Sequence, residues 1–286
     1  MATIISGKEL SKTKKATMKL EVEKLENKYG RRPKLSVILV GDDPGSVSYV
    51  SGKEKACVEI GIINQTIKLK DSTSQEELLK IIDDLNKDPF VDGILIQLPL
   101  PKQINQTYVI NAIEPSKDVD GFHPVNVASL YLKQPGIVPC TPKGIIEVLD
   151  SVNIPIEGKK AVIVGRSNIV GLPVSKLMLD RNATITIAHS RTKNLDEVCR
   201  SADILIAAVG KPKFIKENMV KDGAVVIDVG VNRDPETGKL CGDVDFVNVE
   251  PKASYITKVP GGIGPMTISC LMENTIECFL KHVGVK

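Results

Sequence analysis

Short apolar segments alternate with longer amphipathic ones along the 286-residue chain, and this alternation most limits its fold. In the first half, the segments that we predict as strands are residues 35–40, 64–69 and 93–98. In the second half, they are residues 161–164, 184–188, 204–208, 224–229 and 255–259. Strands that alternate with helices form a parallel sheet covered on both faces. The pattern therefore predicts an α/β protein.

A change of pattern near residue 140 predicts two domains, which the length of the chain also favours. Residues 115–139 are rich in turn formers, and Thr141-Pro142 then opens a new helix with a cap and a proline in its first turn. The last helix, from about 267 to 281, has apolar side chains that would return it to the first domain. We predict an N-terminal αβα domain (1–139 plus 268–286), a C-terminal Rossmann-type dinucleotide-binding domain (140–267), and a cleft between them.

Composition and charge exclude several classes of partner. The net charge of +3, the aromatic content of 3% and the absence of Trp give no surface for nucleic acid. No apolar run is long enough to cross a bilayer, and the N-terminus lacks the pattern of a signal peptide. The six cysteines are scattered without a CxxC pair, which argues against disulfides and a zinc site. We therefore predict a cytoplasmic protein without membrane, nucleic acid or metal.

A glycine loop follows the strand at 161–164, as Gly165-Arg-Ser-Asn-Ile-Val-Gly171. Such a loop between a strand and a helix presents backbone N–H groups to a phosphate. The usual GxGxxG pattern has glycines where this chain has Ser167 and Val170. Taken alone, the loop is as compatible with a tight βα turn as with a dinucleotide site.

The end of the next strand favours NADP over NAD. NAD enzymes place an acidic residue there to bind the ribose hydroxyls. Here the strand at 184–188 continues into His189-Ser190-Arg191, with no acid. Ser190 with the cations Arg166 and Arg191 would instead accept a 2′-phosphate. The alternative is that both arginines are ordinary solvated surface residues.

Three side chains in the first half could meet at one edge of the predicted sheet. Tyr49 and Lys53 lie one turn apart on the helix predicted at 46–60, so they share a face. Gln97 lies at the C-terminal end of a strand, where ligands bind in open α/β sheets. Each has a structural alternative: helix packing for Tyr49, a surface charge for Lys53, and a loop contact for Gln97.

Three further features receive structural interpretations. Asp118 suggests a metal loop, but no further carboxylates follow at ligand spacing, so we favour a turn or cap residue. His123 beside Pro124 is interpreted as structural. Pro260-Gly-Gly-Ile-Gly-Pro265 precedes the last helix, and its glycines allow backbone to approach a ligand closely. We predict that Pro260, Gly261 and Gly262 form a wall of the cleft, an interdomain hinge being the alternative.

Six blocks of the chain, in order, resemble the signatures of the bifunctional methylenetetrahydrofolate dehydrogenase/methenyltetrahydrofolate cyclohydrolase family. The blocks are Tyr49-Val-Ser-Gly-Lys53-Glu-Lys-Ala, Asp92-Gly-Ile-Leu-Ile-Gln97-Leu-Pro-Leu-Pro101, Lys117-Asp-Val-Asp120-Gly-Phe-His-Pro-Val-Asn126, Pro139-Cys-Thr-Pro142, Gly165-Arg-Ser-Asn-Ile-Val-Gly-Leu-Pro173 and Pro260-Gly-Gly-Ile-Gly-Pro-Met-Thr267. The resemblance implies NADP-dependent oxidation of 5,10-methylenetetrahydrofolate and hydrolysis of the methenyl product to 10-formyltetrahydrofolate in one cleft. It also implies a role in one-carbon metabolism and purine biosynthesis.

The resemblance assigns roles to individual residues. It implies that Lys53 is the key catalytic group, that Gln97 tunes it, that Tyr49 lines the folate pocket and that Asp120 binds the pterin. The residues that it implies for the dinucleotide are Gly165, Arg166, Ser167, Ser190 and Val231. It further implies a homodimer, and a sheet edge that needs protection supports this.

Three alternatives remain open from the sequence. The enzyme could carry only the dehydrogenase or only the cyclohydrolase activity. It could be a two-domain oxidoreductase of the shikimate dehydrogenase kind, with a lysine–aspartate pair at a hydroxyl group. It could also bind a dinucleotide as a sensor without turnover, although the presence of Tyr49, Lys53, Gln97 and Asp120 together argues against that.

Overall fold

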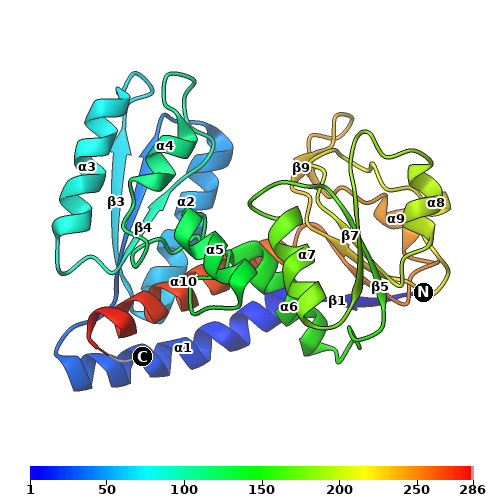
Figure 1. The fold of residues 1–286 in the computed structure, drawn as a ribbon, viewed down its shortest axis with the longest axis horizontal. Coiled ribbons are helices and arrows are strands. Elements are labelled where there is room, and N and C mark those ends of the chain that lie inside the picture. Colours follow the sequence, from blue (N-terminus) through cyan, green and yellow to red (C-terminus); the bar gives the residue numbers. More distant parts are fainter. Residues whose placement is uncertain (285–286) are drawn as a thin grey trace. The chain divides into compact units, whose positions relative to one another are not determined.

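The computed structural model describes residues 1–284, and the chain divides into two compact units. The six-stranded unit comprises Met1–Lys12 and Thr141–Thr267, and the three-stranded unit comprises Thr13–Cys140 and Ile268–Lys286. The chain passes between them within two long helices, α1 (Gly7–Tyr29) and α10 (Ile263–His282), and at the start of α6 (Cys140–Ser151). Figure 1 labels these elements.

The six-stranded unit is a doubly wound parallel sheet. Across the sheet its strands are β1 (Thr3–Ile5), β11 (Tyr255–Thr257), β8 (Val225–Asp228), β7 (Ile204–Ala207), β5 (Lys160–Val164) and β6 (Thr184–Ala188). All neighbouring strands pair in parallel. Because β5 has β6 on one side and β7 on the other, the strand order reverses there, and this is where such sheets bind ligands.

Apolar side chains from both faces of this sheet build two cores. One face packs against α6 and α7 (Gly171–Asp180) through Leu149, Val174 and Met178. The other packs against α8 (Leu195–Arg200), η1 (Glu217–Met219) and α9 (Phe246–Val249) through Cys199, Met219 and Val249. A two-stranded antiparallel hairpin joins β9 (Asn232–Arg233) to β10 (Leu240–Cys241). Strands buried on both faces explain the continuous apolar runs in the sequence.

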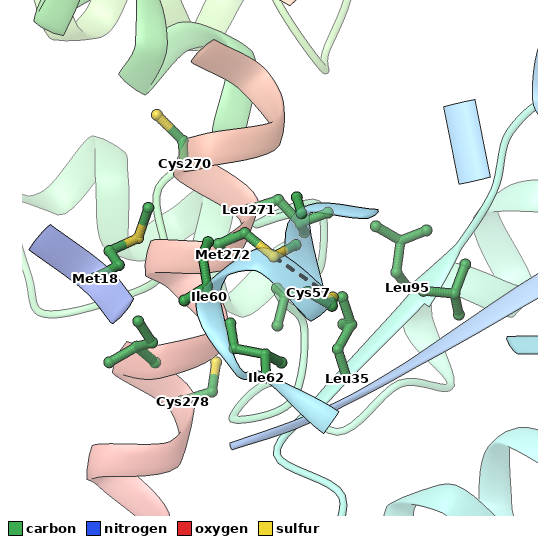
Figure 2. Packing of buried hydrophobic residues seen from close by; sticks show 14 of the residues in the cluster. Met18, Leu35, Cys57, Ile60, Ile62, Leu95, Cys270, Leu271, Met272 and Cys278 are labelled. Atoms are coloured by element: carbon green, nitrogen blue, oxygen red, sulfur yellow. Dashed lines mark hydrogen bonds between the residues drawn. The ribbon is translucent and has the colours of Figure 1, made fainter. Parts of the chain in front are cut away.

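The three-stranded unit has a shorter parallel sheet in the order β3 (Ile63–Leu69), β2 (Lys34–Val40) and β4 (Gly93–Ile96). The side chains of β2 alternate between two cores. Ile38 and Val40 face α3 (Gln75–Lys87) and α4 (Gln106–Asn111). Leu35, Val37 and Leu39 face α2 (Pro44–Ile60), α1 and α10. Figure 2 shows this second core, where Cys57 lies against Met272.

Two parts of the sequence prediction are wrong in detail. Residues 1–12 were placed in the first domain, but Thr3–Ile5 forms β1, which pairs with β11 at the edge of the six-stranded sheet. The last helix begins at Ile263 rather than near residue 267, so Gly264 and Pro265 lie in its first turn. Proline is tolerated there because the first helical N–H groups have no partner within the helix.

The stretch 115–139 was predicted to be loop and contains one further helix, α5 (Pro124–Leu132). His123 caps this helix, since its Nδ1 accepts a hydrogen bond from Val125 N at 3.1 Å. The structural interpretation of His123 is therefore confirmed. Within residues 1–284, no helix combines the length and apolar character that a membrane crossing requires.

Candidate active site

Helix α2 places Tyr49 and Lys53 on one face of the three-stranded unit. The helix begins after Asp43, whose carboxylate accepts from Ser46 N at 2.8 Å, and it ends at Gly61, which has φ +92°. Gly52 lies between the two side chains, and a Cβ there would approach Ile268 Cδ1 of α10 to 3.3 Å. The glycine in this block therefore allows α2 to pack closely on α10.

Lys53 and Gln97 contact each other directly. Lys53 Nζ donates a hydrogen bond to Gln97 Oε1 at 3.0 Å. Gln97 Nε2 donates to Leu98 O at 2.7 Å, which fixes the amide with its oxygen toward the lysine. Gln97 itself is buried, and its N–H donates to Ile38 O on the neighbouring strand. Gln97 thus holds the amine with a neutral acceptor.

The surroundings of Lys53 favour its neutral form. Burial lowers the pKa of the Lys53 amine, because an ammonium ion loses solvation there. The negative charge of Asp120 acts in the opposite direction and raises this pKa. The desolvation effect prevails, so the amine is closer to a usable base than an exposed lysine.

Asp120 faces the same site with an unusual proton affinity. Burial raises the pKa of its carboxyl to about 6, although the positive charge of Lys53 opposes this shift. The side chain is partly exposed, and no residue in the described chain donates a hydrogen bond to its carboxylate in the structure. Its oxygens are therefore available to an N–H-bearing ligand.

The residues around Asp120 brace the loop that carries it. Lys117 Nζ donates to Leu85 O, Asn86 O and Asp88 O at the end of α3. Asp118 accepts from Gly121 N, from His123 N and from the side chain of Asn126. Asp118 is therefore a turn residue, as predicted.

Two further features, at Gly121 and Asn274, hold the loop that carries Asp120 against residues 137–138. Gly121 has φ +71°, and a Cβ there would lie 2.7 Å from Ile137 O, so only glycine fits. The buried Asn274 of α10 donates to Val119 O and Val138 O, both at 2.9 Å. Sequence reasoning missed Asn274, because a polar residue on the apolar face of a helix gives no sign of the distant carbonyl groups that it binds.

Tyr49 is the most open member of the set. It lies one turn before Lys53 and is 39% exposed. Partial burial raises the pKa of its hydroxyl, so it stays neutral and able to donate or accept a hydrogen bond. The structure thus gathers Tyr49, Lys53, Gln97 and Asp120 within one unit.

A second candidate site lies at the switch point of the six-stranded sheet. A hollow of about 310 Å³ is lined there by four residues that the sequence nominated, Gly165, Arg166, Ser167 and Ser190. Gly165 has φ +130°, and a Cβ there would lie 2.2 Å from Ala208 O. A Cβ on Gly171 would lie 2.2 Å from Gly165 O. The two glycines therefore let the loop fold tightly between β5 and α7.

The departures from GxGxxG have a structural explanation. Ser167 Oγ accepts hydrogen bonds from Val170 N at 3.2 Å and from Gly171 N at 3.4 Å. The serine hydroxyl therefore accepts hydrogen bonds from backbone N–H groups at the start of α7. A glycine at residue 167 would leave these N–H groups to bind a ligand or water. This loop combines a tight turn with a hollow beside it, so the two interpretations of the sequence are compatible.

The lining of this hollow differs from the predicted cofactor residues at three positions. Arg191 and Val231 are exposed but do not line it. Lys211 lines it and was not nominated, because the segment Val209-Gly-Lys211 matches no dinucleotide pattern. It adds a third cation, beside Arg166 and Arg191, to this end of the sheet.

The segment Pro260–Gly262 lies in the six-stranded unit, between β11 and α10. Pro260 is exposed, and Gly261 has φ +109° with open space where a Cβ would be. Gly262 is buried, and its carbonyl oxygen would lie 1.9 Å from a Cβ on Gly7. The segment is thus packed on one side and open at Gly261.

Comparisons with known proteins agree on one family. The catalytic-domain model of tetrahydrofolate dehydrogenase/cyclohydrolase matches residues 5–120, and the NAD(P)-binding-domain model matches residues 139–283. The bifunctional protein FolD of Oceanobacillus iheyensis is 56% identical over 97% of this chain and 96% of its own. That of Acetivibrio thermocellus is 55% identical over 100% of this chain and 99% of its own.

Solved structures give the same picture. The bifunctional enzyme FolD of Campylobacter jejuni has a TM-score of 0.94 at 47% identity, covering 97% of this chain and 98% of its own. The Trypanosoma brucei enzyme, complexed with NADP cofactor and inhibitor, has a TM-score of 0.95 at 38% identity over 99% of both chains. A shikimate 5-dehydrogenase of Thermus thermophilus reaches 0.54 at 12% identity, covering 86% of this chain and 99% of its own, and shares the fold alone.

Proposed function

The chain belongs to the tetrahydrofolate dehydrogenase/cyclohydrolase family, and we propose that Lys53 is the base that carries the second of its two reactions. The enzyme oxidises 5,10-methylenetetrahydrofolate to 5,10-methenyltetrahydrofolate with NADP, and then hydrolyses this product to 10-formyltetrahydrofolate. The observation that carries the proposal is the hydrogen bond from Lys53 Nζ to Gln97 Oε1, in surroundings that lower the pKa of the amine.

The hydrolysis needs a proton acceptor. Water adds to the methenyl carbon, and the proton that leaves the water passes to Lys53 Nζ. The bond from this carbon to N5 then breaks as N5 takes a proton and the added hydroxyl gives up its own, which leaves the formyl group on N10 and one released proton on Lys53. A cationic methenyl group beside Lys53 further disfavours the ammonium form. Gln97 holds the amine without adding the negative charge that would stabilise this form, as a carboxylate would.

The oxidation requires fewer catalytic groups from the protein than the hydrolysis does. NADP, when bound, supplies the hydride acceptor, and no protein base is required for the transfer itself. The glycine loop of the six-stranded unit fits a dinucleotide, because Gly165 and Gly171 let it fold tightly while Gly165, Arg166 and Ser167 line the adjoining hollow. We assign the dinucleotide to Gly165, Arg166, Ser167 and Ser190, with Arg191 and Val231 at its margin.

The folate would be held mainly by the three-stranded unit. Asp120 offers two acceptor oxygens to the N–H groups of the pterin, and Tyr49 offers a partly exposed ring and hydroxyl for the wall of the pocket. Pro260, Gly261 and Gly262 are the further folate contacts that we propose, because the open backbone at Gly261 lets a ligand approach closely. We accordingly propose the three-stranded unit as the catalytic domain and the six-stranded unit as the NADP domain.

The raised pKa of Asp120 predicts how KM for methenyltetrahydrofolate changes with pH in acidic solution. Because its pKa is raised to about 6, its carboxylate becomes protonated below that pH and loses an acceptor for the pterin. We expect KM for methenyltetrahydrofolate to rise by up to about tenfold per pH unit below about 6. Measuring KM and kcat separately between about pH 5 and pH 8 tests this. In Asp120→Asn, KM should no longer depend on pH in this range. A wild-type KM that is flat through pH 6 would contradict the assignment.

Both activities can be tested in one assay. Addition of methylenetetrahydrofolate and NADP should produce the methenyl chromophore, which then decays as the product is hydrolysed. Formation without decay would indicate a dehydrogenase alone. Decay of added methenyltetrahydrofolate without any NADP reduction would indicate a cyclohydrolase alone. Shikimate should not be oxidised, since the shikimate dehydrogenases share only the fold.

We also propose a homodimer in the cytoplasm, serving purine biosynthesis. The strands β6 and β1 are the two edges of the six-stranded sheet, and pairing or packing on a partner protects such an edge. Light scattering at micromolar concentration should report about twice the chain mass of 31.0 kDa. A particle of monomer mass would refute the dimer. The free thiols of all six cysteines suit a reducing compartment.

A further inference from the structure

A buried carboxylate binds the backbone of a loop that forms one wall of the dinucleotide hollow. Asp243 is fully buried, at 0% exposure, in the segment between β10 and α9. Its Oδ2 accepts from Val209 N at 2.6 Å and from Gly210 N at 3.0 Å. Its Oδ1 accepts from Lys211 N at 2.9 Å. Three consecutive backbone N–H groups thus converge on one side chain, as they do around a bound anion.

The loop that these bonds hold is the one after β7, and it touches the glycine loop. Val209 and Lys211 line the same hollow as Gly165 and Arg166. Ala208 O lies so close to Gly165 that a Cβ there would be 2.2 Å away. The position of residues 208–211 therefore sets the shape of the wall opposite the glycine loop.

Asp243 also binds the loop after β8. Its Oδ1 accepts from Asn232 Nδ2 at 2.8 Å, next to the candidate cofactor residue Val231. A Cβ on Gly230 would lie 2.3 Å from Asp243 Oδ1, so the backbone at Gly230 packs directly on the carboxylate. One side chain therefore links two of the loops that follow strands at this end of the sheet.

A second carboxylate fixes Asp243 itself. The buried Asp228, at the end of β8, accepts from Gly230 N, Asp243 N and Val244 N, each at 2.9 Å. Within residues 1–284, no basic side chain forms an ion pair with Asp228 or Asp243. Six backbone N–H groups and the side-chain amide of Asn232 therefore satisfy the pair, so the geometry of the two carboxylates and that of the loops depend on each other.

We propose that Asp243 is the positioning residue of the dinucleotide site, which holds the Val209–Lys211 backbone in the conformation that receives NADP. The inference rests on the proposed use of the Gly165 loop for NADP. It adds a residue that does not line the hollow and acts only through the loop. The expected signature is a loss of NADP affinity without a loss of cyclohydrolase chemistry.

The test is Asp243→Asn in the full-length protein, with NADP binding measured by calorimetry. Asparagine keeps the shape but replaces one acceptor oxygen with a donor, so at least one of the three N–H groups loses its partner. We expect the NADP Kd to rise about tenfold. The cyclohydrolase rate on methenyltetrahydrofolate without NADP should stay within about twofold, and amide exchange at residues 209–211 should accelerate. Asp245→Asn is the matched control, since the Asp245 carboxylate binds Lys216 and Asn248 instead.

A second variant leaves the buried pair intact. Gly210 has φ +65° and open space where a Cβ would lie, so Gly210→Ala disfavours the loop conformation without a clash. We expect its NADP Kd to rise about fivefold. If Asp243→Asn does not fold, this variant decides the matter alone. A folded Asp243→Asn protein that binds NADP with wild-type affinity overturns the inference. If Asp243→Asn does not fold, wild-type NADP affinity in Gly210→Ala overturns it instead. A wild-type protein that does not bind NADP overturns the proposed site itself.

Discussion

A Lys53→Met enzyme should hydrolyse methenyltetrahydrofolate roughly 10²–10⁴-fold more slowly than the wild type, which is the usual loss when a general base is removed. Methionine keeps the length of the stem but cannot accept a proton. The apolar stem can remain in place, while Gln97 Oε1 loses its donor at 3.0 Å. NADP affinity should be nearly unchanged, because the glycine loop belongs to the other unit of the chain. Dehydrogenase turnover should fall less, since hydride transfer needs no protein base.

Lys55→Met is the matched control for this variant. Lys55 lies on the same helix, and its side chain is exposed. It should hydrolyse methenyltetrahydrofolate at the wild-type rate, which separates the loss of a particular amine from the loss of any charge on α2. Both proteins are compared by the decay of the methenyl chromophore, with circular dichroism to confirm folding. A Lys53→Met enzyme with the wild-type rate of hydrolysis would remove Lys53, and Gln97 with it, from the proposed mechanism.

The sequence predicted every strand of the two parallel sheets except β1, and it also missed the β9–β10 hairpin. The buried runs that form β2, β4 and β5 are continuous and apolar, so their burial on both faces is legible in the sequence. β1 has only three residues, two of them exposed, and its partner β11 lies some 250 positions away. Nothing local distinguishes such a strand from a frayed terminus, which is why residues 1–12 were assigned to the wrong unit.

In the candidate site, too, the sequence indicates which local segments matter but does not show which distant residues they contact. The block from Lys117 to Asn126 marks a functional region, but the structure uses Lys117, Asp118 and Asn126 to hold the loop and leaves Asp120 free. The interpretation of Asp118 as a turn residue is confirmed, whereas the role of Asp120 came from the family resemblance and stays a prediction. Asp243 could not have been found this way, because its partners at residues 209–211 precede it by 32 to 34 positions and meet it only in the folded unit.

The second large effect concerns the choice between NADP and NAD. Arg166 is exposed in the glycine loop and lines the hollow with Ser190, and no acidic residue follows β6 before Thr192. A charge-assisted contact to the 2′-phosphate is worth about 1.5–3 kcal/mol, or roughly 10- to 150-fold in affinity. Because the side chain is solvated, the lower end of this range applies. Arg166→Ala should therefore lower kcat/KM for NADP roughly tenfold or more.

The same change should leave kcat/KM for NAD almost unaltered, because NAD has no 2′-phosphate for Arg166 to bind. The wild type should accordingly prefer NADP, and the variant should lose much of that preference. Arg181→Ala provides the comparison, since Arg181 is exposed in the same unit but pairs with Asp150. The cyclohydrolase rate of all three proteins should agree, since it does not involve the phosphate. If Arg166→Ala lowers kcat/KM for both dinucleotides equally, Arg166 supports the loop and does not recognise the 2′-phosphate, and Lys211 becomes the cation to test next.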